Sequence, residues 1–147
     1  EGGLHLGSWL TGERYARNMI GDFNNWQEGW LDWNLILDET GGPNHVGNYC
    51  DAPIVADTKT GEIYYNSSYY YIGHFSKYVK PGAKRIEVKL QGITTIKNVG
   101  FINEDKSIAL VVMNETDEEE RFQVEMKGEF VKYILKAHSI VTFLLNE

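Results

Sequence analysis

The chain changes character at Lys80-Pro81-Gly82. Residues 1–80 hold 14 of the 19 aromatic side chains, including all four tryptophans, and they carry 10 acidic against 5 basic residues. Residues 81–147 hold the other five aromatic residues and consist of short segments that alternate apolar and polar positions. A single uniform domain would not be expected to change composition at a Pro-Gly break, so we predict two parts, residues 1–80 and residues 81–147.

The first part has the pattern of an α/β segment. Apolar residues within 9–27 recur at helical spacing, which predicts a helix with Ser8 or Thr11 as its N-cap. Gly29 ends the helix, and residues 30–37 follow as a mostly apolar run, which predicts a parallel strand buried on both faces. The elements expected next are a loop over 38–53 and short strands over 54–56 and 62–65 around a hairpin turn. A second helix is expected to follow, capped by Asn66, Ser67 or Ser68 and running through about Val79.

The second part has the pattern of an all-β fold. Its segments of alternating or continuous apolar residues lie over 85–90, 108–113, 122–126, 131–135 and 139–145. Turn signals rich in Gly, Asn and Asp separate them, among them Lys127-Gly128. About six short strands at this spacing predict a small antiparallel β-sandwich.

Charge and hydropathy exclude several classes of partner. The net charge of −7 argues against nucleic acid and anionic membrane surfaces, because both need a basic face. The longest uninterrupted apolar run, Ile108–Met113, is far shorter than the ~20 residues of a membrane span. A basic region followed by an apolar core and a small-residue cleavage site is absent, so we expect a mature segment or a piece of a longer protein.

The sequence offers little for a metal, a cofactor or a nucleophile. The four histidines never pair at metal-ligand spacing and Cys50 is the single cysteine, so we expect no metal site and no internal disulfide. A lone cysteine is more often a small buried hydrophobic residue than a nucleophile. Gly41-Gly42-Pro43 lacks the Lys and Ser/Thr that follow in a phosphate loop, and we expect no cofactor.

Three polar motifs have simple explanations. Asn66-Ser67-Ser68 and Asn114-Glu115-Thr116 match the N-glycosylation acceptor pattern, which matters only in a secretory pathway. The acidic run Asp117–Glu120 is explained by a solvated turn that protects a sheet edge from aggregation.

Aromatic and polar residues gather at the end of the predicted strand and in the loop after it. Trp30 and Trp33 stand beside Asp32 and Asn34, and the loop adds Asn44, Asn48 and Asp51. Sugars are bound by this combination, because a flat ring stacks on their C–H face while amides and carboxylates bind their hydroxyls. The alternative is that the tryptophans only fill a core, and composition leaves both interpretations open.

Several motifs together resemble one known family. They are His5-Leu6-Gly7-Ser8-Trp9, Gly29-Trp30-Leu31-Asp32-Trp33-Asn34-Leu35, Gly41-Gly42-Pro43-Asn44, Asn48-Tyr49-Cys50-Asp51-Ala52-Pro53-Ile54 and Gly73-His74-Phe75-Ser76-Lys77-Tyr78. The set resembles the C-terminal part of glycoside hydrolase family 30, the glucosylceramidase-like retaining β-glycosidases, and the resemblance runs from the first residues to the end.

The resemblance implies the last part of a (β/α)8 TIM barrel followed by an antiparallel β-sandwich side domain. Residues 9–27 would be the seventh barrel helix, 29–37 the eighth barrel strand and 68–79 the eighth helix. The active site of such a barrel lies at the C-terminal end of the strands. By position, Trp33 resembles the tryptophan that walls the sugar-binding subsite and Asn48 the asparagine that also lines it.

The same resemblance implies a bracing role for one residue and places the catalytic residues outside this segment. One of Asp32 and Asn34 is expected to brace the loop. The two catalytic glutamates of the family lie at the ends of barrel strands four and seven, upstream of this segment, so we expect no catalytic residue here and no activity from the chain by itself. The implied partners are a β-glycoside substrate and the N-terminal barrel segment of the same protein.

The substrate and one rival interpretation stay open. His45 stands where the animal lysosomal members have Trp, which favours a bacterial-type relative. Glucosylceramide, a simple β-glucoside, β-1,6-glucan and xylan are all compatible with the sequence. The rival interpretation is a non-catalytic carbohydrate-binding or structural β-sandwich module, with the aromatic half as its ligand face.

Overall fold

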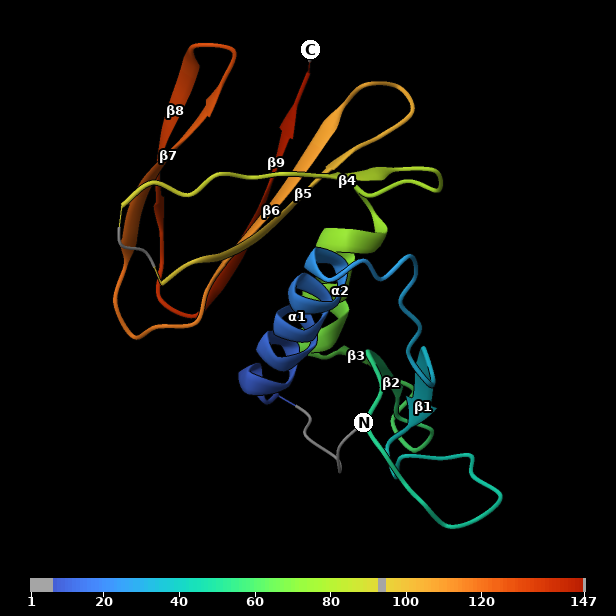
Figure 1. The fold of residues 1–147 in the computed structure, drawn as a ribbon. Coiled ribbons are helices and arrows are strands. Elements are labelled where there is room, and N and C mark those ends of the chain that lie inside the picture. The colour runs from blue at the N-terminus through green and yellow to red at the C-terminus, as the bar shows by residue number, and fades with distance from the viewer. Residues whose placement is uncertain (1–6, 93–94, 147) are drawn as a thin grey trace. The chain divides into compact units, whose positions relative to one another are not determined.

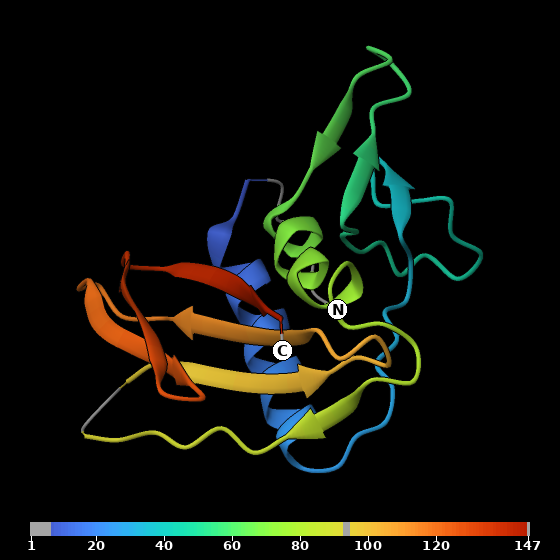
Figure 2. The same ribbon diagram turned by 90° about the horizontal axis from the view of Figure 1, so that it is seen from above.

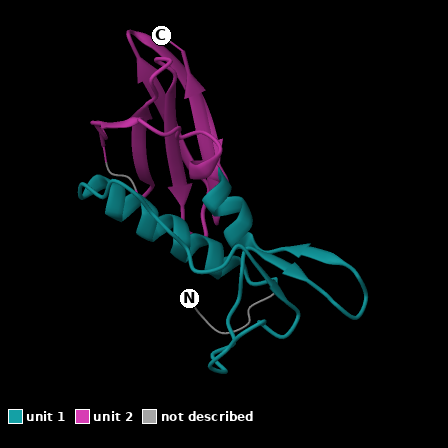
Figure 3. Ribbon diagram, turned by 90° about the vertical axis from the view of Figure 1, so that its right-hand side faces the viewer, with its two compact units in different colours: residues 1–73 teal, residues 74–147 magenta. Residues whose placement is uncertain are grey.

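The computed structural model describes residues 7–92 and 95–146 (Figure 1). Its residues divide into two compact units, unit 1 over Glu1–Gly73 and unit 2 over His74–Glu147, coloured separately in Figure 3. The elements in chain order are α1 Trp9–Asn24, β1 Ile36–Asp38, β2 Ile54–Ala56, β3 Ile63–Tyr65, α2 Ser67–Ser76, β4 Lys84–Ile86, β5 Lys97–Ile102, β6 Ile108–Asn114, β7 Glu120–Met126, β8 Glu129–Leu135 and β9 Ser139–Leu145. Within this described part, neither helix has the length and apolar character to cross a bilayer.

Helix α1 forms where the periodicity predicts it and ends three residues earlier than expected. Ser8 stands at the N-cap position in an extended conformation, without a side-chain capping bond. Asn25 is the C-cap, and Trp26 takes a left-handed conformation with φ of 73°. The Gln27 N–H then donates to the Asp22 carbonyl at 3.1 Å, so the chain turns away from the helix axis at this point.

The two helices approach each other closely at Gly12. The Gly12 N–H donates to Ser67 Oγ at 3.0 Å, and that hydroxyl donates to the Ser8 carbonyl at 2.6 Å. A Cβ atom at position 12 would lie 2.5 Å from Cδ2 of Tyr71, whose side chain is fully buried. Glycine is therefore required where the first turn of α2 crosses α1.

The prediction of a strand over 29–37 is wrong for most of its length. Strand β1 covers only Ile36–Asp38, which pairs in parallel with β2, and β2 pairs in antiparallel with β3. Residues 29–35 have no ladder partner among the described residues, and Leu31 is 96% exposed rather than buried. A strand exists only where another backbone pairs with it, and local sequence does not supply that partner. The predicted strands 54–56 and 62–65 are confirmed within one residue.

Helix α2 is confirmed as an element and runs from Ser67 to Ser76 rather than over 68–79. The residues after it continue as a turn, because the amides of Tyr78 and Val79 both donate to the Phe75 carbonyl. The side chain of Asn66 does not cap the helix and instead points into the preceding loop.

Unit 2 is built from antiparallel strands. Four of them form one sheet in the order β4-β5-β6-β9, seen side by side in Figure 2, and β7 and β8 form a separate hairpin. Leu110 and Val112 of β6 pack with Leu135 of β8, and side chains of β7 and β9 complete this core: Phe122, Val124, Val141 and Phe143. The alternate β6 residues are buried as well, as predicted for a continuous apolar run.

Strand β5 was not expected, and the strand predicted over 85–90 is shorter than expected. Lys97–Ile102 shows no alternation, because three consecutive residues, Val99, Gly100 and Phe101, are all buried between β4 and β6. A Cβ at Gly100 would lie 2.8 Å from Cγ2 of Val88, so glycine lets this neighbour approach. Strand β4 itself ends at Ile86, since only Lys84–Ile86 pairs with β5.

Candidate functional site

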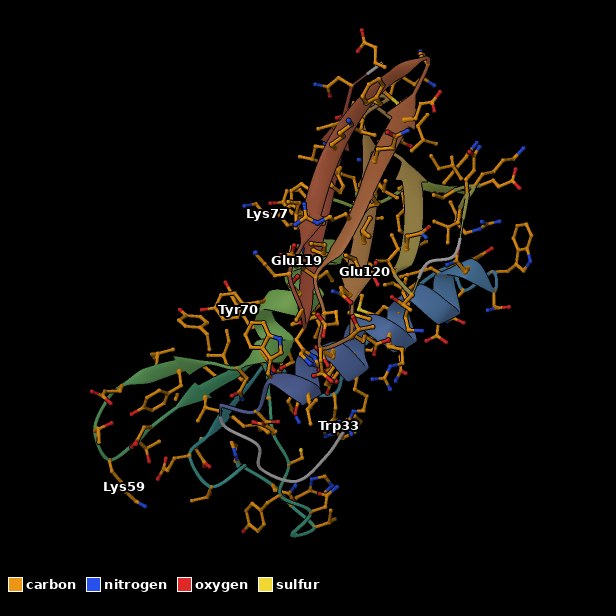
Figure 4. The ribbon with its side chains drawn as sticks, turned by 90° about the vertical axis from the view of Figure 1, so that its left-hand side faces the viewer. Trp33, Lys59, Tyr70, Lys77, Glu119 and Glu120 are labelled. Atoms are coloured by element: carbon orange, nitrogen blue, oxygen red, sulfur yellow. The ribbon has the colours of Figure 1, made fainter. Side chains whose placement is uncertain are left out.

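Trp33 lies in the irregular segment before β1, and the residue is 67% exposed (labelled in Figure 4). Its backbone N–H donates to Asp32 Oδ1 at 2.8 Å. The same carboxylate oxygen accepts a hydrogen bond from the hydroxyl of Tyr15, at 3.2 Å. Asp32 therefore links the backbone of Trp33 to helix α1, while the Trp33 side chain is exposed.

Tyr15 makes a ring contact as well as its hydrogen bond to Asp32. Its ring packs edge-on against Trp30 at 5.5 Å between centroids and 70° between planes. The pKa of Tyr15 is raised to about 12. Burial of the phenol is the main cause, and the negative charge of Asp32 beside it is the second. The phenol is therefore protonated at neutral pH and acts as a donor to Asp32.

A second cluster orders the loop that carries Asn48. Asn44 Nδ2 donates to the Asn48 carbonyl at 2.7 Å and to Asn48 Oδ1 at 2.6 Å. Asn44 Oδ1 accepts the backbone amides of Val46 and Asn48, at 2.8 and 3.2 Å. Asparagine side chains commonly replace backbone partners in this way, and the result is a closed turn that presents Asn48 at the surface.

The base of this loop is fixed by two acidic residues. Asp38 Oδ1 accepts from the hydroxyl of Thr40 at 2.6 Å and from the Gly42 amide at 2.9 Å, and these hydrogen bonds hold the pKa of Asp38 below its usual value. Asp51 Oδ1 accepts from the side-chain amide of buried Asn66 at 2.7 Å. The carboxylates at both ends of the loop are thus engaged in structural contacts.

The predicted site residues fall into two groups. Asp32 and Trp33 are joined by a hydrogen bond, and Asn34 follows them as a partly exposed residue. Asn48 belongs to the other group, together with Asn44. Within the described residues, Asn48 makes no hydrogen bond to Trp33. That Trp33 and Asn48 line one sugar site therefore stays a prediction.

Sequence patterns missed three residues that organise this region. Tyr15 is 17 positions from Asp32, and Asn66 is 15 positions from Asp51, so neither pairing has a local signal. Asp38 had one: an aspartate followed at short spacing by Thr and Gly is typical of a side-chain-closed turn.

Other expectations can be compared with the structure directly. Cys50 is buried beside Leu37 and Ala52, which confirms it as a small hydrophobic residue. No group of three or more possible metal ligands occurs in residues 7–92 and 95–146. Both acceptor asparagines of the glycosylation pattern, Asn66 and Asn114, are buried, at 2% and 0% exposure, so neither presents its amide to a glycan.

Comparison with known proteins identifies both parts of the chain. Residues 1–79 match the glycosyl hydrolase family 30 TIM-barrel domain, and residues 82–143 match the glycosyl hydrolase family 30 β-sandwich domain. The lysosomal acid glucosylceramidase of Mus musculus is 32% identical over 145 residues, which cover 98% of this chain and 28% of that protein.

Two solved structures have the same fold. SrfJ from Salmonella typhimurium is 36% identical with a TM-score of 0.90, covering 97% of this chain and 32% of that one. An endo-β-1,6-glucanase is 30% identical with a TM-score of 0.82, covering 91% of this chain and 31% of that one. The chain thus spans about a third of the length of these relatives.

These matches confirm the predicted fold class, with a partial TIM-barrel segment over residues 1–79 followed by an antiparallel β-sandwich domain. They also confirm the resemblance drawn from the motifs. The chain belongs to glycosyl hydrolase family 30 and is a glucosylceramidase-like part of such a hydrolase.

Proposed function

We propose that the protein carrying this chain is a retaining β-glycosidase of the glucosylceramidase or β-glucosidase type, and that the chain supplies a wall of its sugar subsite. The observation that carries the proposal is the match to a lysosomal acid glucosylceramidase along 98% of the chain. The proposed wall consists of the Trp33 ring and the Asn48 amide.

The exposed groups of these two residues suit a sugar. The Trp33 indole is exposed while its backbone is anchored, so the ring can stack on the C–H face of a pyranose without first being ordered. Asn48 Oδ1 accepts from Asn44, whereas Asn48 Nδ2 donates no hydrogen bond within the described residues. That Nδ2 is available to a sugar hydroxyl.

The acidic residues of this region suit bracing rather than bond cleavage. Retaining hydrolysis needs two carboxyl groups about 5 to 5.5 Å apart, one as nucleophile and one as acid/base. Asp32, Asp38 and Asp51 each accept hydrogen bonds from neighbouring backbone or side-chain donors. This supports our proposal that both reactive glutamates lie upstream and that the chain alone is inactive.

The test uses the full-length protein with 4-nitrophenyl β-glucoside, and the anomer first released is followed by NMR. We expect hydrolysis with retention, and we expect Trp33→Ala to raise KM about 10-fold, the equivalent of about 1.4 kcal/mol of lost stacking. Tyr70→Phe, on the exposed face of α2, is the matched control and should leave KM unchanged. An inverted product, or an unchanged KM for Trp33→Ala, would contradict the proposal.

A second substrate is favoured by one specific observation, the 30% identity to an endo-β-1,6-glucanase of known structure. Parallel assays with glucosylceramide in detergent and with β-1,6-glucan separate the two. If the full-length protein hydrolyses no glycoside but the isolated chain binds glucosides in a Trp33-dependent way, the carbohydrate-binding module is the correct interpretation.

A further inference from the structure

Regular secondary structure does not hold Trp33 in place. The first backbone pairing after α1 is the hydrogen bond from Ile54 N–H to the Leu35 carbonyl, at 3.1 Å, and residues 29–34 have none among the described residues. Backbone pairing therefore does not fix the peptide that carries the ring. Among the described residues, this peptide is oriented by the hydrogen bond from the Trp33 amide to Asp32 Oδ1, at 2.8 Å. The orientation of Trp33 therefore depends on the position of the Asp32 carboxylate.

The Asp32 carboxylate is in turn positioned by Tyr15. The phenol hydroxyl donates to Asp32 Oδ1 at 3.2 Å, the same oxygen that accepts the Trp33 amide. Tyr15 projects from α1, next to Ala16, which is fully buried. Tyr15 thus connects an ordered helix, through one carboxylate oxygen, to an irregular segment.

Two further contacts limit the movement of Tyr15. Its ring meets Trp30 edge-on at 5.5 Å, and the Arg14 guanidinium lies 5.9 Å from the ring centroid. Trp30 and Trp33 belong to the same irregular segment, so the phenol contacts it at both ends: by ring packing at Trp30 and by a hydrogen bond at Asp32. Removal of the hydroxyl alone would leave the ring packing intact and release the carboxylate.

We propose that Tyr15 is a positioning residue of the sugar subsite: its hydroxyl orients Asp32, and Asp32 orients the backbone of Trp33 so that the indole is held ready for the sugar. The inference rests on the proposed function, because it assumes that Trp33 contacts the substrate. Preorganisation of this kind strengthens binding, since less conformational freedom is lost when the sugar arrives. It is expected to affect KM more than kcat, because Tyr15 does not touch the reacting bond.

The experiment compares Tyr15→Phe, Trp33→Ala and the double variant in the full-length protein, with 4-nitrophenyl β-glucoside as the probe. We expect Tyr15→Phe to raise KM about 5-fold, the effect of one hydrogen bond of ordinary net strength, while kcat changes less than about 2-fold. In the Trp33→Ala background the same substitution should leave KM unchanged, because the ring that it positions is gone. Tyr70→Phe serves as the control, because the Tyr70 ring is half exposed on α2 and meets Tyr69 edge-on at 5.3 Å.

The outcomes separate this inference from the proposed function. If Trp33→Ala leaves KM unchanged, the proposed function fails and this inference fails with it. If Trp33→Ala raises KM but Tyr15→Phe does not, only the inference fails. An equal rise in KM for Tyr15→Phe with and without Trp33 would also overturn it, because Tyr15 would then act by another route. Asp32→Ala breaks the same link from its other end and should reproduce the KM effect, which keeps the test decisive if one variant folds poorly.

Discussion

The helices cross closely at Gly12, and we predict that Gly12→Ala destabilises the protein. Helix propensity alone predicts the opposite effect. Alanine is favoured over glycine inside a helix by about 1 kcal/mol. At position 12, however, the new Cβ would lie 2.5 Å from Tyr71 Cδ2 and 2.9 Å from the backbone carbonyl carbon of Ser67, distances that require the helices to move apart. Overpacking of this kind costs about 1–3 kcal/mol.

Separation of the helices also breaks a hydrogen bond. The Ser67 hydroxyl accepts from Gly12 N–H at 3.0 Å, a buried contact worth about 1 kcal/mol. The overpacking and the lost bond together cost about 2–4 kcal/mol, and the propensity gain of about 1 kcal/mol offsets part of this. We therefore expect Gly12→Ala to destabilise the contact between α1 and α2 by about 1–3 kcal/mol.

Gly21→Ala is the matched control, because Gly21 lies in the same helix and a Cβ there meets nothing within 4 Å. It should stabilise α1 by about 0.5–1 kcal/mol. Both variants are made in the full-length protein, and hydrogen exchange of the α1 amides measures local opening while thermal unfolding measures the whole. If the two variants slow exchange equally, Gly12 has room for a side chain and the described helix crossing is wrong.

Three further predictions concern turns and buried polar groups. Asp38 has a lowered pKa because Thr40 and Gly42 donate to it, so its contribution to stability is present above pH about 4 and is lost as the pH falls through the folded-state pKa. Asp38→Asn should flatten the acid limb of urea midpoints between pH 2 and 5, and an unchanged limb would contradict this. Asn114 is fully buried and binds Glu118, Lys136 and Thr116, so Asn114→Ala should cost about 2–4 kcal/mol in chemical unfolding. A loss below about 0.5 kcal/mol would mean that these bonds matter little. Gly128 has φ of 84° in the two-residue turn between β7 and β8, so Gly128→Ala should cost about 1 kcal/mol of stability. Lys127, at φ of 53°, is the control, because asparagine tolerates this conformation and Lys127→Asn should cost no stability. Thermal unfolding measures both.

Local patterns predicted the elements whose cause is local. Residues 9–24 are amphipathic at helical spacing, and Lys127-Gly128 sits between two alternating runs, so the helix α1 and the β7–β8 hairpin follow from the sequence. The strand over 29–37 failed for the opposite reason, since most of that segment depends on partners that its own residues do not specify. Strand β5 was missed because Gly100 and its buried neighbours hide the alternation.

Only part of the candidate site could be predicted, because some of its contacts are local in sequence and others are made only in the fold. Family motifs contain Trp33, Asp32 and Asn48. Tyr15 occupies an ordinary position of an amphipathic helix, and only the fold brings it to Asp32. The Asn44–Asn48 turn is local and could have been expected from its composition, but its role in presenting Asn48 depends on geometry.

The most direct measurement is a crystal structure of the full-length protein with a bound glucose-configured iminosugar. We expect the Trp33 ring to stack on the sugar at about 4 Å and Asn48 Nδ2 to donate to one of its hydroxyls. We also expect Asp32 to keep its hydrogen bonds from the Tyr15 hydroxyl and the Trp33 amide. An inhibitor bound away from Trp33, or Trp33 and Asn48 directed to opposite sides of the barrel, would contradict the proposed sugar subsite.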